Sequence, residues 1–257
     1  MNFFFGLNLD NCHSLLTIPK FTNEGNLIKQ NSLFKLMIKK DYWLIKKQYC
    51  DEDENFFYLD ISVEDIENFF FLCKEDFCGS KGEKKINELS SFNNIKTNFT
   101  FRANLRIYNK NKEYTSYQSD YPLDMVKRTG DILTTVSSLL NQDQDNLLVF
   151  KQIYFLPVKK PFSVYLVNLQ TEKVVVKRTF YTNSTNILNL NHIKDLKNCC
   201  FFSDGFLGLP IFVSYGQKKG LSMEHSHPPH LYILSDNKYK VVSALKEKVK
   251  KIVSQLH

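Results

Sequence analysis

The sequence predicts a mainly β protein, either an antiparallel β-sandwich or a jelly-roll-like barrel, with an amphipathic C-terminal helix packed on it. From residue 96 onward, short segments rich in β-branched and aromatic residues follow one another across short polar gaps. Clear helical periodicity is confined to about the last twenty residues. With 257 residues, 43% of them hydrophobic, the chain is long enough to bury a full core.

For residues 1–95 the sequence predicts a region of mixed strands and helix that belongs to the same globule as the sandwich. The segment "ENFFYLDIS" (54–62) is aromatic and β-branched enough to be a strand. Ser62 is a candidate N-cap for a short helix, whereas the following "NFFFLCK" fits a buried strand or a helix equally well. Residues 79–94 are polar and glycine-containing, which predicts a surface loop.

For residues 96–236 the sequence predicts the antiparallel strands that form the core of the sandwich. Strict alternation over 97–109 indicates a half-buried strand. Its apolar face carries Phe99, Phe101, Ala103, Leu105 and Ile107, and its polar face carries Arg102, Asn104, Arg106 and Tyr108.

The segment 130–146 fits either a helix capped by Asp131 or a strand, and its apolar stripe slightly favours the helix. Three strands are then expected at 147–158, 162–169 and 173–183. The gaps between them, "KKP" and "QTE", are short enough for hairpins.

For residues 237–257 the sequence predicts the C-terminal helix, with Asp236 as its N-cap. Lysines fill the faces that the apolar stripe leaves. We expect this helix to dock on the sheet and not on a membrane, because its stripe contains no Trp or Phe to anchor in a bilayer. The stripe consists of Tyr239, Val242, Leu245, Val249, Ile252, Val253 and Leu256.

The segment "SMEHSHPPHLYIL" (222–234) holds three of the six histidines. In an extended strand His225 and His227 point to one face, and a polyproline II turn over the two prolines returns His230 to that side. Three imidazoles with an open position are the form of a catalytic site for one transition metal ion, Zn or Fe.

Over these few residues the chain resembles the cupin motif, in which a His-x-His pair is followed by a Glu ligand. The resemblance implies a metal-dependent enzyme, but Leu231 and Tyr232 stand where the Glu is expected. Two alternatives remain open at this point. One is a polar ligand pocket lined by His225 and His227, and the other is a structural loop.

Other candidate ligand-binding residues lie in two further segments. Arg102 and Arg106 share a strand face and fit a phosphate or carboxylate, with a solvated face as the alternative. Tyr117 and Tyr121 belong to "SYQSDYP", a polar loop of the kind that contacts sugars. Glu224 adjoins the histidines, although in a strand it faces away from them.

Composition restricts the expected partners. The net charge of +7 is modest and mostly local to the C-terminus, so no nucleic-acid partner is expected. No apolar run is long enough to span a membrane, and the absence of a secretory signal indicates a cytoplasmic protein. The six cysteines show no C-x-x-C spacing and are expected to be free thiols.

Two functions therefore remain. The first is a non-catalytic β-sandwich that binds a small molecule or a protein partner of unknown identity. The second is a metal-dependent, cupin-like small-molecule enzyme acting on a sugar or sugar nucleotide, with His225, His227 and His230 as ligands. The binding protein is favoured, because an enzyme of this length should show more than one chemical signal. The sequence indicates no catalytic residue and is compatible with a homo-oligomer.

Overall fold

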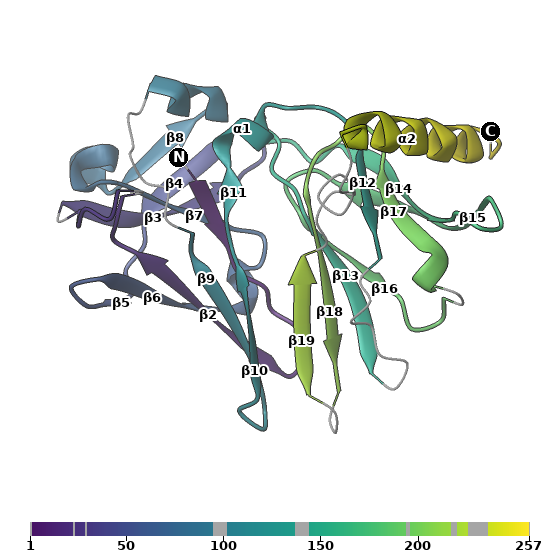
Figure 1. The fold of residues 1–257 in the computed structure, drawn as a ribbon. Helices are drawn as coiled ribbons and strands as arrows, with labels where there is room; N and C mark the ends of the chain where they lie inside the picture. The colour runs from purple at the N-terminus through teal and green to yellow at the C-terminus, as the bar shows by residue number, and fades with distance from the viewer. Residues whose placement is uncertain are drawn as a thin grey trace. The chain divides into compact units, whose positions relative to one another are not determined.

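Four antiparallel sheets account for most of the regular structure (Figure 1), so the predicted mainly β class is confirmed. The computed structural model describes residues 2–22, 24–28, 30–94, 102–136, 144–193, 196–216, 220–225 and 236–256. The chain divides into unit 1, residues 1–127 with 153–158, and unit 2, residues 128–152 with 159–257. The predicted division of the chain into regions 1–95, 96–236 and 237–257 is a separate matter and stays a prediction.

Unit 1 contains two sheets. The first has six strands in the order β11 (Tyr121–Pro122), β1 (Asn2–Phe5), β7 (Phe69–Lys74), β3 (Asn31–Ile38), β4 (Trp43–Lys47) and β8 (Glu83–Ile86). The second has five strands in the order β10 (Tyr114–Gln118), β9 (Asn104–Asn109), β2 (Cys12–Pro19), β6 (Phe56–Ile61) and β5 (Asp51–Glu52). Between strands lie the 3₁₀ segments Val63–Asp65, Glu75–Lys81 and Leu89–Asn94 and the short helix α1 (Leu123–Val126).

Unit 2 contains two four-stranded sheets and the C-terminal helix. The first sheet has the order β12 (Ile132–Thr135), β17 (Cys199–Ser203), β14 (Pro161–Asn168) and β15 (Lys173–Tyr181). The second has the order β16 (Thr185–Asn189), β13 (Asp145–Lys151), β18 (Leu209–Tyr215) and β19 (Leu221–His225). A 3₁₀ segment, Leu196–Asn198, precedes β17, and α2 (Lys238–Ser254) ends the unit.

The core of unit 1 is built mainly from phenylalanine. Strands β1 and β7 are buried on both faces, which agrees with their continuous apolar runs, and β3 is buried at Ser32–Phe34 and at Leu36. On one face, ring pairs 5.1–5.9 Å apart join β1, β3 and β7 to Phe77 and Phe92 of the 3₁₀ segments. The two sheets come close at Gly6, where a Cβ atom would collide with the side chain of Ile61 in β6.

The core of unit 2 is a sandwich, because its buried cluster draws side chains from both sheets. The cluster consists of Leu148, Phe150, Phe162, Val164, Leu166, Phe180, Leu188, Leu190, Phe201 and Phe212. Alternate residues of β14 point the other way: Tyr165 and Val167 contact Val249, Ile252 and Val253 of α2. The predicted docking of the helix on the sheet is therefore confirmed.

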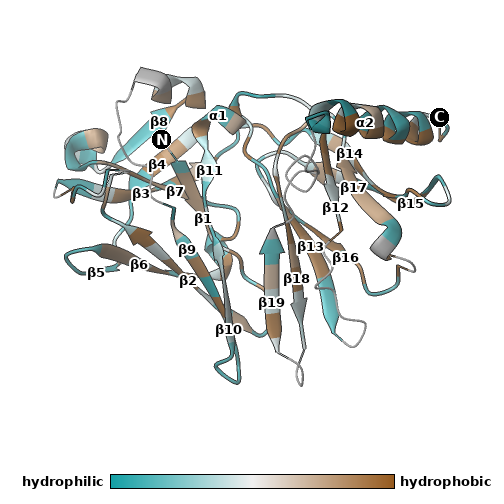
Figure 2. Cartoon of the chain, viewed as in Figure 1, coloured by the Kyte–Doolittle hydropathy of each residue, from teal (hydrophilic) through white to brown (hydrophobic). Residues whose placement is uncertain are grey.

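Helix α2 begins differently from the prediction. Asn237, not Asp236, occupies the N-cap position, and its side chain makes no capping hydrogen bond. Tyr239 and Leu256, both predicted in the apolar stripe, are 66% and 50% exposed. Figure 2 shows hydrophobic and hydrophilic patches alternating along α2. Within the described ranges, no helix is both long and apolar enough to cross a membrane.

The helix favoured over 130–146 is wrong at both ends of that segment, and residues 137–143 lie outside the described residues. Residues 132–135 form β12, which pairs with β17, and β13 already begins at Asp145. Leu133 contacts the cluster under α2, whereas Ile132 packs against the sandwich core. A strand covered on both faces thus explains why Ile132 and Leu133 are both apolar.

Two loop predictions also differ from the structure. The "KKP" hairpin is wrong, since β13 and β14 lie in different sheets and residues 153–158 between them belong to unit 1. By contrast, the predicted "QTE" hairpin is confirmed by the antiparallel pairing of β14 with β15. The second difference concerns the predicted surface loop. Residues 79–94 are not all loop, because Glu83–Ile86 pair with β4 as β8.

Candidate binding cavity

A cavity of ≈ 600 Å³ opens in unit 1 where the chain crosses from one sheet to the other. The ends of β2, β4 and β5 and the beginning of β3 supply its walls. Strand ends gather polar side chains because the ladder hydrogen bonds stop there and the backbone turns toward solvent. The lining consists of Lys20, Leu27, Ile28, Asn31, Ser32, Leu33, Lys47, Gln48, Tyr49, Cys50, Glu52, Glu54, Phe57 and Glu75.

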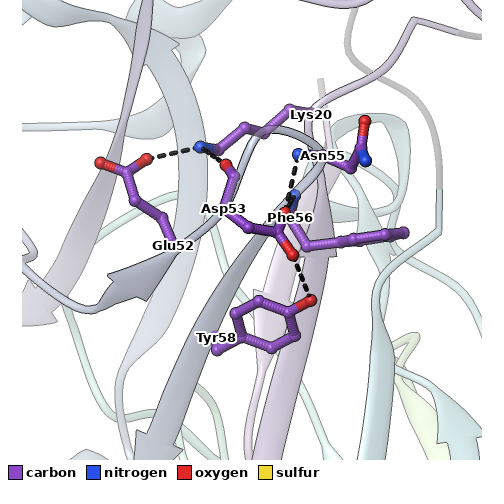
Figure 3. A network of polar contacts seen from close by, with 6 residues as sticks. All are labelled: Lys20, Glu52, Asp53, Asn55, Phe56 and Tyr58. Atoms are coloured by element: carbon purple, nitrogen blue, oxygen red, sulfur yellow. Dashed lines mark hydrogen bonds and ion pairs between the residues drawn. The ribbon is translucent and has the colours of Figure 1, made fainter.

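Lys20 is the most firmly held charge of the lining (Figure 3). Its side chain is only 13% exposed, and Nζ donates to Glu52 Oε2 at 2.6 Å and to the carbonyl oxygen of Asp53 at 2.5 Å. The same ammonium lies 4.4 Å from the ring centre of Phe57, a cation–π distance. Lys20 therefore has its charge balanced inside the protein.

Asp53 fixes the turn beside Lys20. Its Oδ1 accepts hydrogen bonds from the backbone N–H groups of Asn55 and Phe56, both at 2.7 Å, and its Oδ2 accepts one from Tyr58 Oη at 2.7 Å (Figure 3). These bonds, led by the one from Tyr58, lower the pKa of Asp53. The network holds the β5–β6 turn at one edge of the cavity.

The remaining charges leave the cavity with an acidic surplus. Lys47 pairs with Glu75 at 2.7 Å, and this hydrogen bond raises the pKa of Lys47 and lowers that of Glu75. Glu54 makes no ion pair with any residue that the structure describes. Among the described residues, two lysines and three glutamates line the cavity, so these five side chains carry a net charge of −1.

Asn31 adds an unsatisfied donor at the first position of β3. Its Nδ2 is buried and has no hydrogen-bond partner among the described residues. An unpaired buried amide costs about 1–3 kcal/mol. A ligand acceptor bound in the cavity would remove that cost.

The thiol of Cys50 is not activated. Burial, with a further contribution from Glu52, raises the pKa of Cys50 to about 11. At pH 7 only about one thiol in ten thousand would be ionised, and the thiolate is the nucleophilic form. The lining thus offers ion pairing, hydrogen bonding and aromatic contact, but no prepared nucleophile.

The structure places the predicted ligand residues on different faces of unit 1. Arg102 Nη1 donates to Gln118 Oε1, and Arg106 lies with Tyr108 on the outer face of β9. Tyr117 lies on β10 opposite Leu105 and points inward, and burial raises its pKa. Tyr121 is fully buried beside Phe3 and is not accessible to a sugar. The ligand roles of these residues stay predictions.

Asp120 carries a buried carboxyl group next to these residues. Within the described part of the chain its Oδ1 has no hydrogen-bond partner, and burial raises the pKa of Asp120 although the charge of Arg102 acts in the opposite direction. An acid whose pKa is higher in the folded state destabilises the fold at pH values above its unfolded pKa of about 4.

Asp120→Asn is therefore expected to stabilise the protein at pH 7 by about 1 kcal/mol, or about 2–4 °C in Tm. The gain should shrink as the pH falls toward 4 and vanish below about pH 3, where the wild-type carboxyl is protonated in both the folded and the unfolded state. Thermal unfolding of both proteins at pH 7 and at about pH 3 measures the difference. A variant less stable than wild type at pH 7 would contradict this view of Asp120.

The histidine segment lies mostly outside the described residues. His225 ends β19 opposite Ile211, and Glu224 pairs with Phe212, whereas His227 and His230 are not described. Among the described side chains, no group of three or more His, Cys, Asp or Glu is arranged to hold a metal ion. The metal site at 225–230 stays a prediction.

The cavity residues escaped sequence reasoning because they are scattered from Lys20 to Glu75 and form no motif. The usable signal was weak: polar residues stand at the ends of several apolar strands, as in "IPK" and "IKKQYC". Comparison with protein-family models, curated proteins and solved structures finds no match to this chain.

Proposed function

We propose that the chain is a non-catalytic β-sandwich binding protein whose ligand is a small polar molecule carrying a protonated amine. The observation that carries this proposal is the cavity of ≈ 600 Å³ in unit 1, which is within the range for small-molecule sites. Its acidic surplus and the unpaired Glu54 favour a cation, since both lysines are already paired.

Two further features support this ligand class. The Asn31 Nδ2 donor requires an acceptor such as a hydroxyl or carbonyl oxygen next to the amine. Phe57 and Tyr49 offer ring surface to the apolar part or to the ammonium itself. The protonated thiol of Cys50 supports binding without covalent chemistry.

Glucosamine, N-acetylglucosamine and glucose 6-phosphate provide one ring with a positive, neutral or negative substituent. We expect the amine to bind most tightly in calorimetric titrations of the full chain. Glu54→Gln should weaken it about tenfold, because it removes a charge-assisted hydrogen bond. Asn31→Leu should weaken it as well.

Asp41→Asn is the matched control, since Asp41 is an exposed acid at the opposite end of the β3–β4 hairpin. It should bind like wild type. Equal affinity for all three sugars, or an amine affinity unchanged in Glu54→Gln, would contradict the proposed ligand class.

A further inference from the structure

Arg106 occupies the middle of a three-strand surface on the outer face of the five-stranded sheet. Its strand β9 lies between β10 and β2, with Ser116 and Leu15 as its direct cross-strand neighbours. One step along the strands, Tyr108 lies between Tyr114 of β10 and His13 of β2. The alternate residues Leu105 and Ile107 are buried, so this face points away from the core.

The guanidinium of Arg106 is held by tyrosines and not by an acid. Its Nη1 donates to Tyr108 Oη at 3.0 Å, and Cζ lies 5.1 Å from the ring centre of Tyr114 and 5.9 Å from that of Tyr108. No carboxylate of the described residues forms an ion pair with it, and its Nε has no hydrogen-bond partner. Most of its five N–H donors are therefore unused.

Asp60, which lies on the adjoining strand β6 and pairs with Leu15, is an acid of this face that already has a partner. Asp60 Oδ1 lies 3.1 Å from His13 Nε2. The ring of His13 in turn lies 6.3 Å from that of Tyr108, and Tyr114, 60% exposed, lies 5.8 Å from Tyr108. The surface thus combines an unpaired, oriented cation with an accessible aromatic ring.

We propose that this surface, called the Arg106 site and formed by His13, Arg106, Tyr108 and Tyr114, binds a small aromatic anion such as a nucleoside monophosphate. The guanidinium fork matches a phosphate bidentately, and the flat ring of the ligand stacks on Tyr114. The site shares no residue with the cavity of the proposed function, so the two proposals stand or fall separately.

Titration of the full chain with AMP, adenosine and inorganic phosphate tests the site. AMP should bind more tightly than either part, because only AMP engages both the cation and the ring. Arg106→Gln should weaken AMP about tenfold or more. Arg106→Lys should recover only part of the loss, since an ammonium lacks the planar fork. Tyr114→Ala should weaken AMP and adenosine alike.

Arg178→Gln is the control. Arg178 is an exposed arginine of unit 2 whose Nη1 bonds only a neighbouring backbone carbonyl, and AMP affinity should not change. Equal AMP affinity in wild type and Arg106→Gln, or no AMP binding, would overturn the proposal. A single-stranded oligonucleotide binding far more tightly than AMP, with a steep salt dependence, would replace the small ligand by a nucleic acid. Unchanged thermal unfolding of each variant separates loss of binding from loss of fold.

Discussion

Gly208→Ala is expected to destabilise unit 2 by about 2–3 kcal/mol. A Cβ atom at this position would collide with the ring of Phe150 and lie 2.6 Å from the carbonyl oxygen of Lys151. Phe150 is fully buried in the sandwich core, and the carbonyl belongs to the backbone of the central strand β13. Neither neighbour is able to move without disturbing the sheet. Urea unfolding followed by circular dichroism measures the loss.

Gly216→Ala is the matched control for that substitution. Among the described residues, the atom nearest to its Cβ would be Gln144 Cγ at 3.4 Å, which is an ordinary van der Waals contact. We expect a change within about 0.5 kcal/mol for this variant. Similar losses in the two variants would show that close packing at Gly208 is not the cause.

A chain that stops at Lys127 is expected not to fold cooperatively. The missing residues 153–158 belong to unit 1. The Phe155 carbonyl oxygen accepts Trp43 Nε1–H at 3.1 Å and the Leu89 N–H at 3.0 Å, and the Ile153 backbone bonds the buried Tyr121 hydroxyl. Truncation leaves these buried groups unpaired at about 1–3 kcal/mol each. Trp43 fluorescence and near-UV circular dichroism report whether the fragment packs.

The decisive comparison is the same fragment with residues 153–158 joined to it through a flexible linker. That chain should recover a cooperative transition and the buried emission of Trp43, which is 1% exposed in the intact protein. A truncated fragment as stable as the joined one would show that residues 153–158 contribute little to unit 1.

The sequence predicted strands well where one face alone is buried. Alternation in 97–109 correctly placed Ala103, Leu105 and Ile107 in the core, because a period of two is visible when the other face is polar. Phe99 and Phe101, predicted on the same face, lie outside the described residues. The prediction failed at 130–136, where both faces of β12 are covered. Residues 153–158 return to unit 1 because of tertiary packing. The length of the gap between the two predicted strands does not indicate this return.

The residues of the candidate sites also differ in whether a local sequence pattern could place them. Arg106 and Tyr108 were placed on one face from the local pattern alone, and the structure adds Tyr114 and His13 from neighbouring strands. Lys20, Asn31 and Glu54 meet only through strand pairing and the crossing between sheets. No short-range rule connects them, so the cavity required the structure.

The return of residues 153–158 has a consequence for synthesis on the ribosome. Unit 1 cannot complete its core when Lys127 leaves the exit tunnel, because 31 more residues must follow before Val158 does. At ordinary translation rates this interval lasts about 2–6 s. During that time the ribosome synthesises β12 and β13 of unit 2, before the core of unit 1 is complete. The two units therefore mature in an interleaved order and not one after the other, and the nascent chain exposes an unfinished, phenylalanine-rich core to chaperones for those seconds.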